Sequence, residues 1–319
     1  MININTLEPI FFFPIEKDYV WGGKKIYKFK KSQKDNTIAE SWEISANANG
    51  DCVIQNDFLN RVTLSELFRS FEYRKIIFGK KTLRMKQFPI LIKFIDAKKN
   101  LSIQVHPDDR YAQKYENAKG KNEMWYIVDC SPKAELICGF NKIYTKKSII
   151  NSINNQSIQD YLKYIKIKKG DSIYIPAGTV HAILKNCFVC EIQQNSDLTY
   201  RLYDWNRKDS NGNLRTLHTK KAMENIKILK KAKVYRKTKK KNQNIKVKNF
   251  KVEDKEIVSE FKDNSNYKTF YAVVILKGKG EIISNNFRRK IKQGDSFLIP
   301  SYLGEYKLCG KLHFLKISI

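Results

Sequence analysis

Two of the four histidines in this chain of 319 residues stand in segments patterned to hold a metal ion. The run from Leu101 to His106 reads as a β-strand, in which side chains alternate between two faces. Ser102, Gln104 and His106 share one polar face, while the opposite face is apolar. Because Gln104 and His106 are two positions apart, both can grip one ion from one strand. Taken alone, this pattern also fits an ordinary exposed polar face.

The second histidine, His181, ends a spaced motif, Gly170-x5-Pro176-x-Gly178-x2-His181. This motif fits the second sequence motif of the cupin barrel at every fixed position. Gly170 permits a hairpin turn, and Pro176 and Gly178 shape the next turn. His181 then starts a strand that faces the barrel interior.

A carboxylate completes the candidate ligand set. Glu123 lies just before an apolar strand and joins His106 and His181, with Gln104 as an optional fourth ligand. A mixed nitrogen and oxygen set with an open position suits catalytic Zn²⁺, one ion per chain, although Mn²⁺ or Fe²⁺ also fit. His218 and His313 are expected to be structural or surface residues.

An internal repeat indicates two related β-barrels. Residues 170–176 read Gly-Asp-Ser-Ile-Tyr-Ile-Pro and residues 294–300 read Gly-Asp-Ser-Phe-Leu-Ile-Pro, an offset of 294 − 170 = 124 residues. The second copy has Glu305 where the first has His181. We therefore predict a mainly β fold with inserted helices, built from two cupin (jelly-roll) β-barrels, the second degenerate and metal-free. Residues 1–230 are expected to form the catalytic barrel with its helical segments, and residues 231–319 the C-terminal cupin-like barrel.

Local patterns predict the elements around these motifs. Thr63 and Glu66 form a capping box that starts a helix over 63–80, and Thr145 is the expected N-cap of a helix over 146–163. Strands are predicted over 89–95, 101–106 and 124–129, and again from 164 to 203. In the second unit they are predicted over 270–276, 281–284, 295–300 and 311–318, with a turn at Gly278-Lys279-Gly280.

The composition limits the classes of partner that we expect. The net charge is +29, but 50 of the 61 basic residues are lysine and only 11 are arginine. A reader of nucleic-acid sequence more often uses arginine, so we interpret most of the charge as solvated surface that would attract an anionic substrate. No nucleic-acid partner is expected. No apolar run approaches the roughly 18 residues of a membrane helix, so no membrane partner is expected either. Six scattered cysteines favour a reducing cytoplasm.

Over nearly its whole length the chain resembles the type I mannose-6-phosphate isomerases (phosphomannose isomerases), in particular their short bacterial form. The markers of the resemblance are Glu8-Pro9-Ile10, Trp21-Gly22-Gly23, Glu40-Ser41-Trp42-Glu43-Ile44-Ser45, the runs 101–109 and 175–182, Gly120-Lys121-Asn122-Glu123, the run 193–197, Tyr200-Arg201 and Tyr203-Asp204-Trp205. The Ser-Ile-Gln-x-His-Pro-Asp stretch is the most specific. Ala39 stands where the family usually has Gly, and Asn47-Ala48 where it often has His-Pro. Neither position is a ligand.

The resemblance implies a role for each site residue. The implied metal ligands are Gln104, His106, Glu123 and His181. The implied catalytic residues are Arg201, Glu191 and Lys121, and the implied substrate-binding residues are Lys93, Ser102 and Arg201. Lys93 is also unusual on packing grounds, because an ammonium in an apolar strand needs a wet or anionic partner. A lysine that snorkels to the surface would explain it equally well.

The implied activity is a metal-dependent aldose–ketose isomerisation that interconverts mannose 6-phosphate and fructose 6-phosphate through an enediol intermediate. Such a reaction needs a Lewis acid, a base and a positive group near the developing charge. Glu191 is the first candidate for the base and Lys121 the second, and Arg201, Lys93 and Lys121 are all eligible to bind the phosphate. The expected partner is a small sugar phosphate, and the oligomeric state has no marker in the sequence.

The alternative function is a non-catalytic cupin module that binds sugar phosphate or RNA. Its footprint would lie in the lysine-rich stretch 230–251, at Lys230, Lys231, Lys233, Arg236, Lys237, Lys239, Lys240 and Lys241. Only Tyr235 could stack on bases among these residues, and the ligand set would have no use in such a module.

Overall fold

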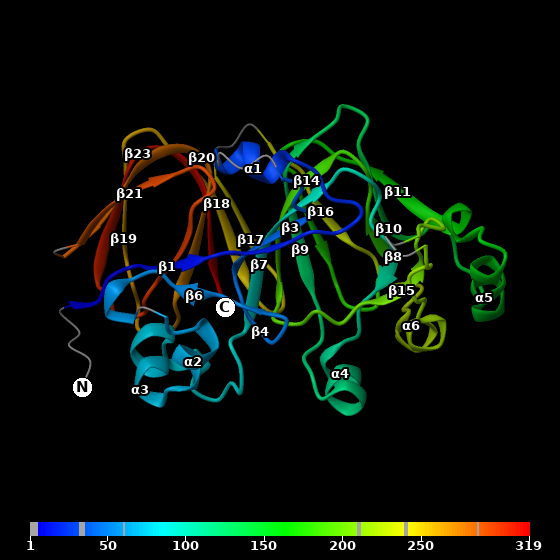
Figure 1. Cartoon of the computed structure of the whole chain (residues 1–319), viewed down its shortest axis with the longest axis horizontal. Helices are drawn as coiled ribbons and strands as arrows, with labels where there is room; N and C mark the ends of the chain where they lie inside the picture. Colours follow the sequence, from blue (N-terminus) through cyan, green and yellow to red (C-terminus); the bar gives the residue numbers. More distant parts are fainter. Residues whose placement is uncertain (1–5, 32–35, 60, 209–211, 239–241, 286) are drawn as a thin grey trace.

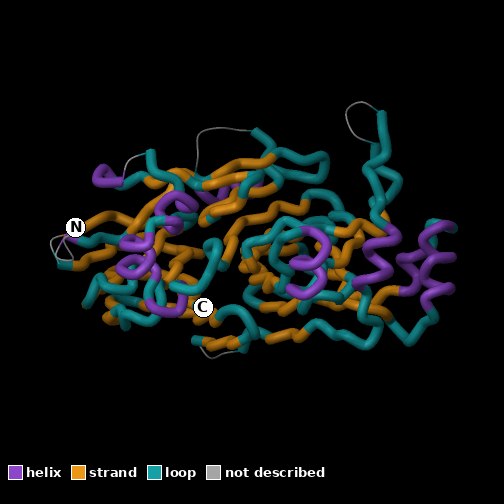
Figure 2. The backbone as a smooth tube through the Cα atoms, turned by 90° about the horizontal axis from the view of Figure 1, so that it is seen from below, coloured by secondary structure: helices purple, strands orange, loops and turns teal. Residues whose placement is uncertain are grey.

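The chain folds into two strand-rich halves that lie side by side along the long axis of the molecule, with most helices at the outer edges (Figures 1 and 2). The computed structural model describes residues 6–31, 36–59, 61–208, 212–238, 242–285 and 287–319. Each half is built from antiparallel strands arranged like a jelly roll, and within the described residues the sheets are not joined into one closed barrel. This mainly β architecture with inserted helices confirms the predicted fold class.

The first half is a sandwich of a seven-stranded and a five-stranded sheet. The seven-stranded sheet has the order β16 (Lys233–Tyr235), β12 (Ser172–Ile175), β9 (Glu123–Cys130), β14 (Cys187–Gln194), β7 (Ile90–Ala97), β3 (Glu40–Ile44) and β2 (Ile15–Lys17). The five-stranded sheet has the order β11 (Leu162–Lys166), β10 (Glu135–Phe140), β13 (His181–Ile183), β8 (Ile103–Val105) and β15 (Tyr200–Tyr203). Ile95 and Trp125 of the larger sheet meet Leu136 and Ile183 of the smaller one in a buried inner core.

The two central strands of the larger sheet are buried on both faces. All eight residues of β7 and all eight of β14 are buried. One face lies in the inner core, and the other, with Phe94 and Phe188, packs into a core shared with the second half. Strands that are buried on both faces read as nearly continuous apolar runs. The charged Lys93 and Asp96 are therefore exceptions that need partners.

The second half is a nine-stranded sheet that includes strands from the N-terminus. Its path is β17 (Gln243–Lys246), β18 (Lys251–Ile257), β23 (Glu305–Ser318), β20 (Tyr271–Ser284), β22 (Ser296–Ile299), β1 (Ile10–Phe13) and β6 (Val53–Ile54), with β19 (Glu260–Asn264) on β23 and β21 (Phe287–Lys292) on β20. β1 thus joins the second half, while β16 joins the first. The domain division at residue 230 stays a prediction, and strands cross it in both directions.

Both copies of the repeat begin with the same turn. Gly170 and Gly294 have φ angles of +87° and +91°, in the left-handed region that favours glycine. The following aspartates, Asp171 and Asp295, each accept a hydrogen bond from the backbone N–H three residues earlier, at 3.1 and 2.8 Å. The turns lead into β12 and β22, so the sequence repeat is a structural one.

The helices start where the sequence predicts and end earlier. Thr63 caps α2 (Leu64–Arg69) with a complete capping box, but the backbone is extended at Ser70 (ψ 119°). The guanidinium of Arg74 donates to two carbonyl oxygens at the end of α2, at 2.8 and 3.3 Å, and so takes the place of helical N–H groups. Thr145 caps α5 (Lys146–Asn154), which stops before Gln156 with its φ of +58°.

The remaining helical segments are short. They are α1 (Lys25–Lys30), α3 (Phe71–Tyr73), the π-helical η3 (Arg74–Phe78), α4 (Asp109–Glu116) and α6 (Thr219–Asn225), with the 3-10 turns η2 (Asp57–Leu59), η4 (Lys80–Thr82) and η5 (Ile158–Tyr161). Residues of α5 and α6 pack on the outer face of the five-stranded sheet. β4 (Ala46–Asn47) and β5 (Gly50–Asp51) form a separate small hairpin.

The turn predicted at Gly278-Lys279-Gly280 is wrong. These residues lie inside β20, which runs on against β23 with one register shift. A Cβ atom at Gly278 or Gly280 would lie 2.0 Å from the carbonyl oxygen of Lys311 or Cys309. The glycines therefore allow two strands to approach closely at an irregular point of the ladder, rather than allowing the chain to reverse.

The strand that links the halves gives a test of this packing. Phe11 on β1 is 4% exposed, its ring centroid lies 4.9 Å from that of Phe297, and the Arg289 guanidinium lies 3.7 Å above it. We expect Phe11→Ala to lower the free energy of unfolding by about 3–5 kcal/mol. Phe13→Ala, on the same strand but 55% exposed, is the matched control and should cost about 0.5 kcal/mol or less. Urea unfolding measures both, and equal midpoints for the two variants would contradict this packing.

Candidate active site

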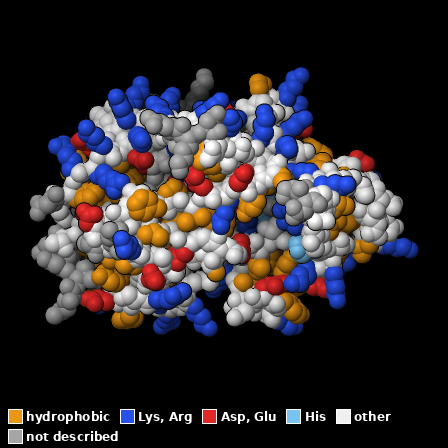
Figure 3. All heavy atoms as spheres, viewed as in Figure 1, with side chains coloured by type: hydrophobic (Ala, Val, Ile, Leu, Met, Phe, Trp, Pro, Cys, Tyr) orange, Lys and Arg blue, Asp and Glu red, His pale blue; other side chains and the backbone are white. Residues whose placement is uncertain are grey.

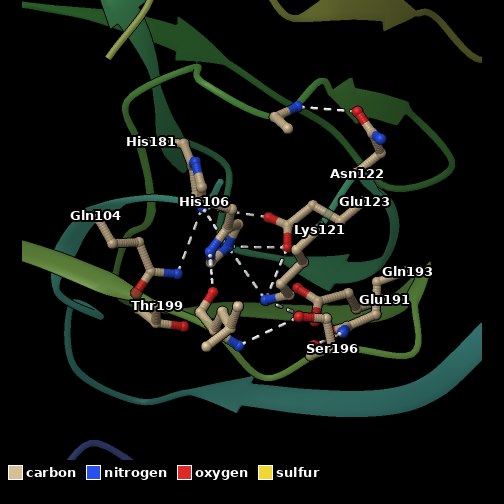
Figure 4. A network of polar contacts seen from close by, with 12 residues as sticks. Gln104, His106, Lys121, Asn122, Glu123, His181, Glu191, Gln193, Ser196 and Thr199 are labelled. Carbon is tan, nitrogen blue, oxygen red and sulfur yellow. Dashed lines mark hydrogen bonds and ion pairs between the residues drawn. The ribbon is translucent and has the colours of Figure 1, made fainter. Parts of the chain in front are cut away.

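Three buried side chains converge between the two sheets of the first half: His106 just after β8, Glu123 at the start of β9 and His181 at the start of β13 (Figure 4). His106 Nε2 lies 3.2 Å from Glu123 Oε2, and His181 Nε2 lies 3.2 Å from Glu123 Oε1. The two imidazole Nε2 atoms are also 3.2 Å apart. The three candidate ligand atoms all lie within 4.8 Å of one another, so one ion can contact all three.

The second nitrogen of each imidazole decides which nitrogen carries the proton. His106 Nδ1 lies 2.8 Å from the carbonyl oxygen of Leu198, and His181 Nδ1 lies 2.8 Å from that of Thr179. A carbonyl oxygen can only accept, so each Nδ1 donates and each Nε2 presents a lone pair to the shared centre. Burial lowers the pKa of His106 to about 3 and also lowers the pKa of His181. Both rings are therefore in the neutral form that binds metal.

Glu123 makes the centre electron-rich. Its two buried oxygens accept no hydrogen bond within the described residues, although Lys121 Nζ lies 2.9 Å from Oε2. Burial acts to raise the pKa of Glu123, but the nearby positive charge, that of the Lys121 ammonium above all, holds the pKa well below its usual range. A carboxylate and two lone pairs that face one another repel unless a cation lies between them. The donor set fits a divalent metal ion.

Gln104 lies beside this centre, opposite His181 in the β8–β13 ladder. Its amide nitrogen faces His181 Nε2 at 3.4 Å, and its oxygen accepts a hydrogen bond from Ser102 Oγ at 3.0 Å. An amide binds a metal through its oxygen, so Gln104 becomes a ligand only if the amide turns over. Its role as the fourth ligand stays a prediction.

Charges alternate from the centre across the inner face of the larger sheet. Glu191 Oε1 lies 3.9 Å from Lys121 Nζ and 3.1 Å from Lys93 Nζ. Lys93 Nζ in turn lies 3.2 Å from Glu40 Oε2. Burial acts to lower the pKa of Lys93, but the carboxylates of Glu191 and Glu40 outweigh it and raise the pKa. Lys93 is 7% exposed and paired on both sides, so it does not snorkel to the surface.

Two tryptophans fix the carboxylates on either side of Lys93. Trp125 Nε1 donates to Glu191 Oε2 at 2.8 Å, and Trp42 Nε1 donates to Glu40 Oε2 at 2.7 Å. With Oε2 engaged by Trp125, the other oxygen of Glu191 accepts no hydrogen bond within the described residues. Glu191 is therefore oriented with one oxygen toward the cations Lys93 and Lys121.

Arg201 stands on β15, next to Gln104 in the ladder. Its guanidinium donates to the carbonyl oxygen of Thr216 at 2.9 Å, while its Nε has no partner within the described residues. Burial and the neighbouring Arg215 lower its pKa. A guanidinium with a donor to spare can bind an anionic group.

These side chains line one cavity of about 490 Å³. The residues predicted from the sequence that line it are Lys93, Ser102, Gln104, Lys121, Glu191 and Arg201. His106, Glu123 and His181 are buried behind this lining, where Lys121 and Gln104 contact them. The structure thus brings every predicted site residue to one place.

Among the other residues of the cavity wall, four that act on the predicted side chains were not predicted as site residues. Trp42 and Glu40 lie two apart in a motif that carried the resemblance, and Trp125 lies two residues after Glu123, so strand alternation could have placed them on the inner face. Arg215 also lines the cavity, but no pattern in the sequence marks it.

Comparison with known proteins gives a consistent result. Residues 12–143 match the family model "phosphomannose isomerase type I, catalytic domain", and residues 240–319 match "mannose-6-phosphate isomerase, cupin domain". The chain is 39% identical over 321 residues to the mannose-6-phosphate isomerase ManA of Bacillus subtilis, covering 96% of this chain and 97% of that protein. The chain belongs to the type I mannose-6-phosphate isomerase family. The predicted family and enzyme class are confirmed.

Solved structures agree with this assignment. The crystal structure of the mannose 6-phosphate isomerase from Bacillus subtilis superposes with a TM-score of 0.86 at 32% identity, covering 98% of this chain and all (100%) of that one. The apo form of mannose 6-phosphate isomerase from Salmonella typhimurium is 14% identical and superposes with a TM-score of 0.73, covering 98% and 99%. At that identity it shows the shared isomerase fold alone.

Several sequence features lie outside the isomerase site. His218 Nδ1 accepts a hydrogen bond from the backbone of Arg201 at 3.2 Å, and His313 Nε2 lies 2.5 Å from Asp254. In the lysine-rich stretch, Arg236 and Lys237 pair with buried aspartates, and Lys239, Lys240 and Lys241 lie outside the described residues. Figure 3 shows Lys and Arg side chains spread over the whole face drawn. In the part of the chain that the structure describes, each helix is too short or too polar to cross a bilayer.

The ion pairs of Lys93 with Glu40 and Glu191 predict how much stability is lost when the Lys93 ammonium is removed. Lys93→Met would leave two buried carboxylates without their shared counter-ion, so we expect a loss of about 3–5 kcal/mol in the free energy of unfolding. Lys17→Met is the matched control, because Lys17 lines the same cavity but its Nζ donates to the carbonyl oxygen of Asn49, at 2.6 Å. It should cost about 0.5 kcal/mol. Urea unfolding decides, and a Lys93 variant as stable as the Lys17 variant would refute the buried pairing.

Proposed function

We propose that this protein is a metal-dependent isomerase that interconverts mannose 6-phosphate and fructose 6-phosphate through an enediol. One observation carries the proposal: a single cavity is lined by an oriented carboxylate and an arginine with a donor to spare, and two of its lining residues, Lys121 and Gln104, contact a buried ligand set. Relatives in Bacillus subtilis carry the names of mannose-6-phosphate isomerases. The geometry offers the groups that such a reaction needs.

The metal we propose is Zn²⁺, held by His106, Glu123 and His181, with Gln104 as a fourth ligand once its amide has turned over. Mn²⁺ and Fe²⁺ accept the same nitrogen and oxygen donors. When bound, a divalent ion of this kind acts as a Lewis acid on the oxygens of the open-chain sugar.

Glu191 is the base that we propose. Trp125 holds its Oε2, so Oε1 can take the proton from C2 of the aldose. The C–H electron pair then becomes the C1–C2 double bond, and the negative charge moves to the oxygen at C1. The hydroxyl proton on the oxygen at C2 passes to the oxygen at C1, and return of the proton from Glu191 to C1 completes the ketose, with its carbonyl at C2. Lys121, the second candidate for the base, lies between Glu123 and Glu191, where an ammonium stabilises the charge of the enediolate.

Arg201 is the phosphate-binding residue that we propose. Its guanidinium forms no ion pair within the described residues, whereas Lys93 and Lys121 each lie against two carboxylates. Lys93 then acts on substrate through the Glu191 carboxylate that it holds. Ser102, beside Gln104, is the proposed contact to a sugar hydroxyl. The six free cysteines support a reducing compartment, and we expect the protein to act in the cytoplasm.

One prediction of the proposed function concerns the metal. A coupled assay on mannose 6-phosphate should show turnover in the protein as purified, none after chelator treatment, and recovery with Zn²⁺. His181→Ala should lose both the bound zinc and the turnover, because it removes one of three ligands. His313→Ala, which removes a histidine outside the ligand set, should keep both.

Two outcomes would contradict the proposal. Turnover in zinc-free His181→Ala would exclude a metal-dependent reaction. Bound zinc without turnover on either sugar phosphate would instead support a binding module, and steeply salt-dependent RNA binding would identify its ligand class.

Another prediction of the proposed function distinguishes the role of the base from that of the metal ligands. Glu191→Gln keeps the size of the side chain and its acceptor for Trp125 but cannot take a proton, so kcat should fall by about 10²–10⁴-fold while zinc stays bound. In D₂O, the wild-type protein should introduce deuterium at C1 of fructose 6-phosphate, as expected for an enediol. Normal turnover by Glu191→Gln, with loss of turnover in Lys121→Met, would assign the base to Lys121.

A further inference from the structure

Asn122 stands between Lys121 and Glu123, and its side chain points away from both (Figure 4). The two neighbours face the ligand centre, so alternation along the strand sends Asn122 to the other side. Asn122 is 6% exposed and contacts neither the ligand atoms nor the cavity. The proposed mechanism gives it no part.

Every hydrogen-bonding position of its amide is nevertheless filled. Asn122 Nδ2 donates to Gln194 Oε1 at 2.6 Å and to Asn249 Oδ1 at 3.0 Å. Its Oδ1 accepts from the backbone N–H of Ala177 at 2.9 Å and from the Tyr174 hydroxyl at 3.4 Å. A buried amide with all four positions engaged holds the segments that it joins in one arrangement.

Backbone groups fix which way this amide points. The N–H of Ala177 needs an acceptor, so the oxygen of Asn122 faces it. The backbone N–H of Asn122 donates to Gln194 Oε1 at 3.0 Å, which makes that atom the oxygen of Gln194. Gln194 N–H returns a hydrogen bond to the carbonyl oxygen of Asn122 at 3.1 Å. The two residues are thus joined by three hydrogen bonds, two donated by Asn122 and one donated by Gln194.

The joined segments are those that carry the proposed chemistry. Gln194 lies three residues after Glu191 on β14, and Ala177 lies four residues before His181, in the turn that leads into β13. Asn122 itself holds Lys121 and Glu123 on either side. The amide of Asn122 therefore connects three segments. They are β14, which carries the proposed base Glu191, the turn before His181, and the start of β9, which carries Glu123.

We propose that Asn122 is a positioning residue that sets the spacing of the metal ligands and the base without touching either. The expected effect of Asn122 on turnover rests on the proposed function. Its expected effect on metal binding depends only on the cluster of His106, Glu123 and His181. Mutation of a residue that orients metal ligands without binding the metal typically lowers metal affinity or activity by about 10–100-fold.

The test compares Asn122→Ala with Asn56→Ala. Asn56 is also buried, at 5% exposed, and its amide makes three hydrogen bonds: Oδ1 accepts from Phe11 N at 2.8 Å, and Nδ2 donates to Glu8 Oε1 at 2.6 Å and Pro9 O at 2.9 Å. It lies next to β6, remote in sequence from the ligand set. Both variants should lower the melting temperature, since both leave buried groups unpaired.

Only the Asn122 variant should alter the site. We expect its affinity for Zn²⁺, measured on the metal-free protein by competition with a chelating dye, to fall by about tenfold or more. Its kcat should fall by a similar factor with little change in KM, because Asn122 does not itself line the cavity. In a double-mutant cycle, Asn122→Ala and Gln194→Ala should be non-additive in zinc affinity, and Asn122→Ala and Asn56→Ala should be additive.

Zinc affinity and kcat within twofold of wild type in Asn122→Ala, with a melting temperature lowered as in Asn56→Ala, would overturn the inference and leave Asn122 a structural residue. If Asn122→Ala does not fold, Gln194→Ala removes two of the three hydrogen bonds that join the two residues, and the same two readouts apply to it. A wild-type protein that binds zinc but does not turn over mannose 6-phosphate would refute the proposed function and still leave the zinc-affinity comparison decisive.

Discussion

The first half is organised around one electrostatic constraint: two imidazole lone pairs and a carboxylate face one another in a place closed to water. His106, Glu123 and His181 are each at most 1% exposed, and both Nδ1 protons are directed outward to carbonyl oxygens. Such a group of acceptors is stable only beside positive charge. Lys121 supplies part of it at 2.9 Å, and the ligand geometry leaves a place for a metal ion. The lumen around it must then be polar, although its walls are strands of a buried core.

Strand register turns this constraint into an ordered network. In the ladders, Glu191 lies opposite Lys93 on β7 and opposite Trp125 on β9. Carboxylate, ammonium and indole N–H are therefore cross-strand neighbours, within reach of one another without any loop. A slip by one residue would send each of these side chains to the other face of the sheet. The apolar residues that alternate with them, such as Phe94 and Phe188, oppose that slip because they are buried in the shared core.

A feature could be predicted from the sequence when the residues that create it lie close together in the chain, and was missed when they lie far apart. Candidate ligands could be predicted because the motif ending at His181 and the alternation of Gln104 and His106 are local patterns. Trp125 and Glu40 were missed as site residues because their roles depend on partners at Glu191 and Lys93, and no local pattern states that register. The break after α2 depends on Arg74, and the glycines at 278 and 280 read as a turn because their true partner, β23, lies some thirty residues further along the chain.

The second half has kept the repeat without the histidine, and packing explains why the repeat persists. β7 and β14 have two buried faces, so an outer layer must cover the face turned away from the lumen. Phe297 and Phe314 of the second half belong to the same core as Phe94 and Phe188. Strands and turns are needed for that layer, but a metal ligand is not. The second half also reaches the site through Asn249, which accepts a hydrogen bond from Asn122 at 3.0 Å. The degenerate copy thus covers the outer face of the sheet that carries the site and hydrogen-bonds a residue that neighbours a candidate metal ligand.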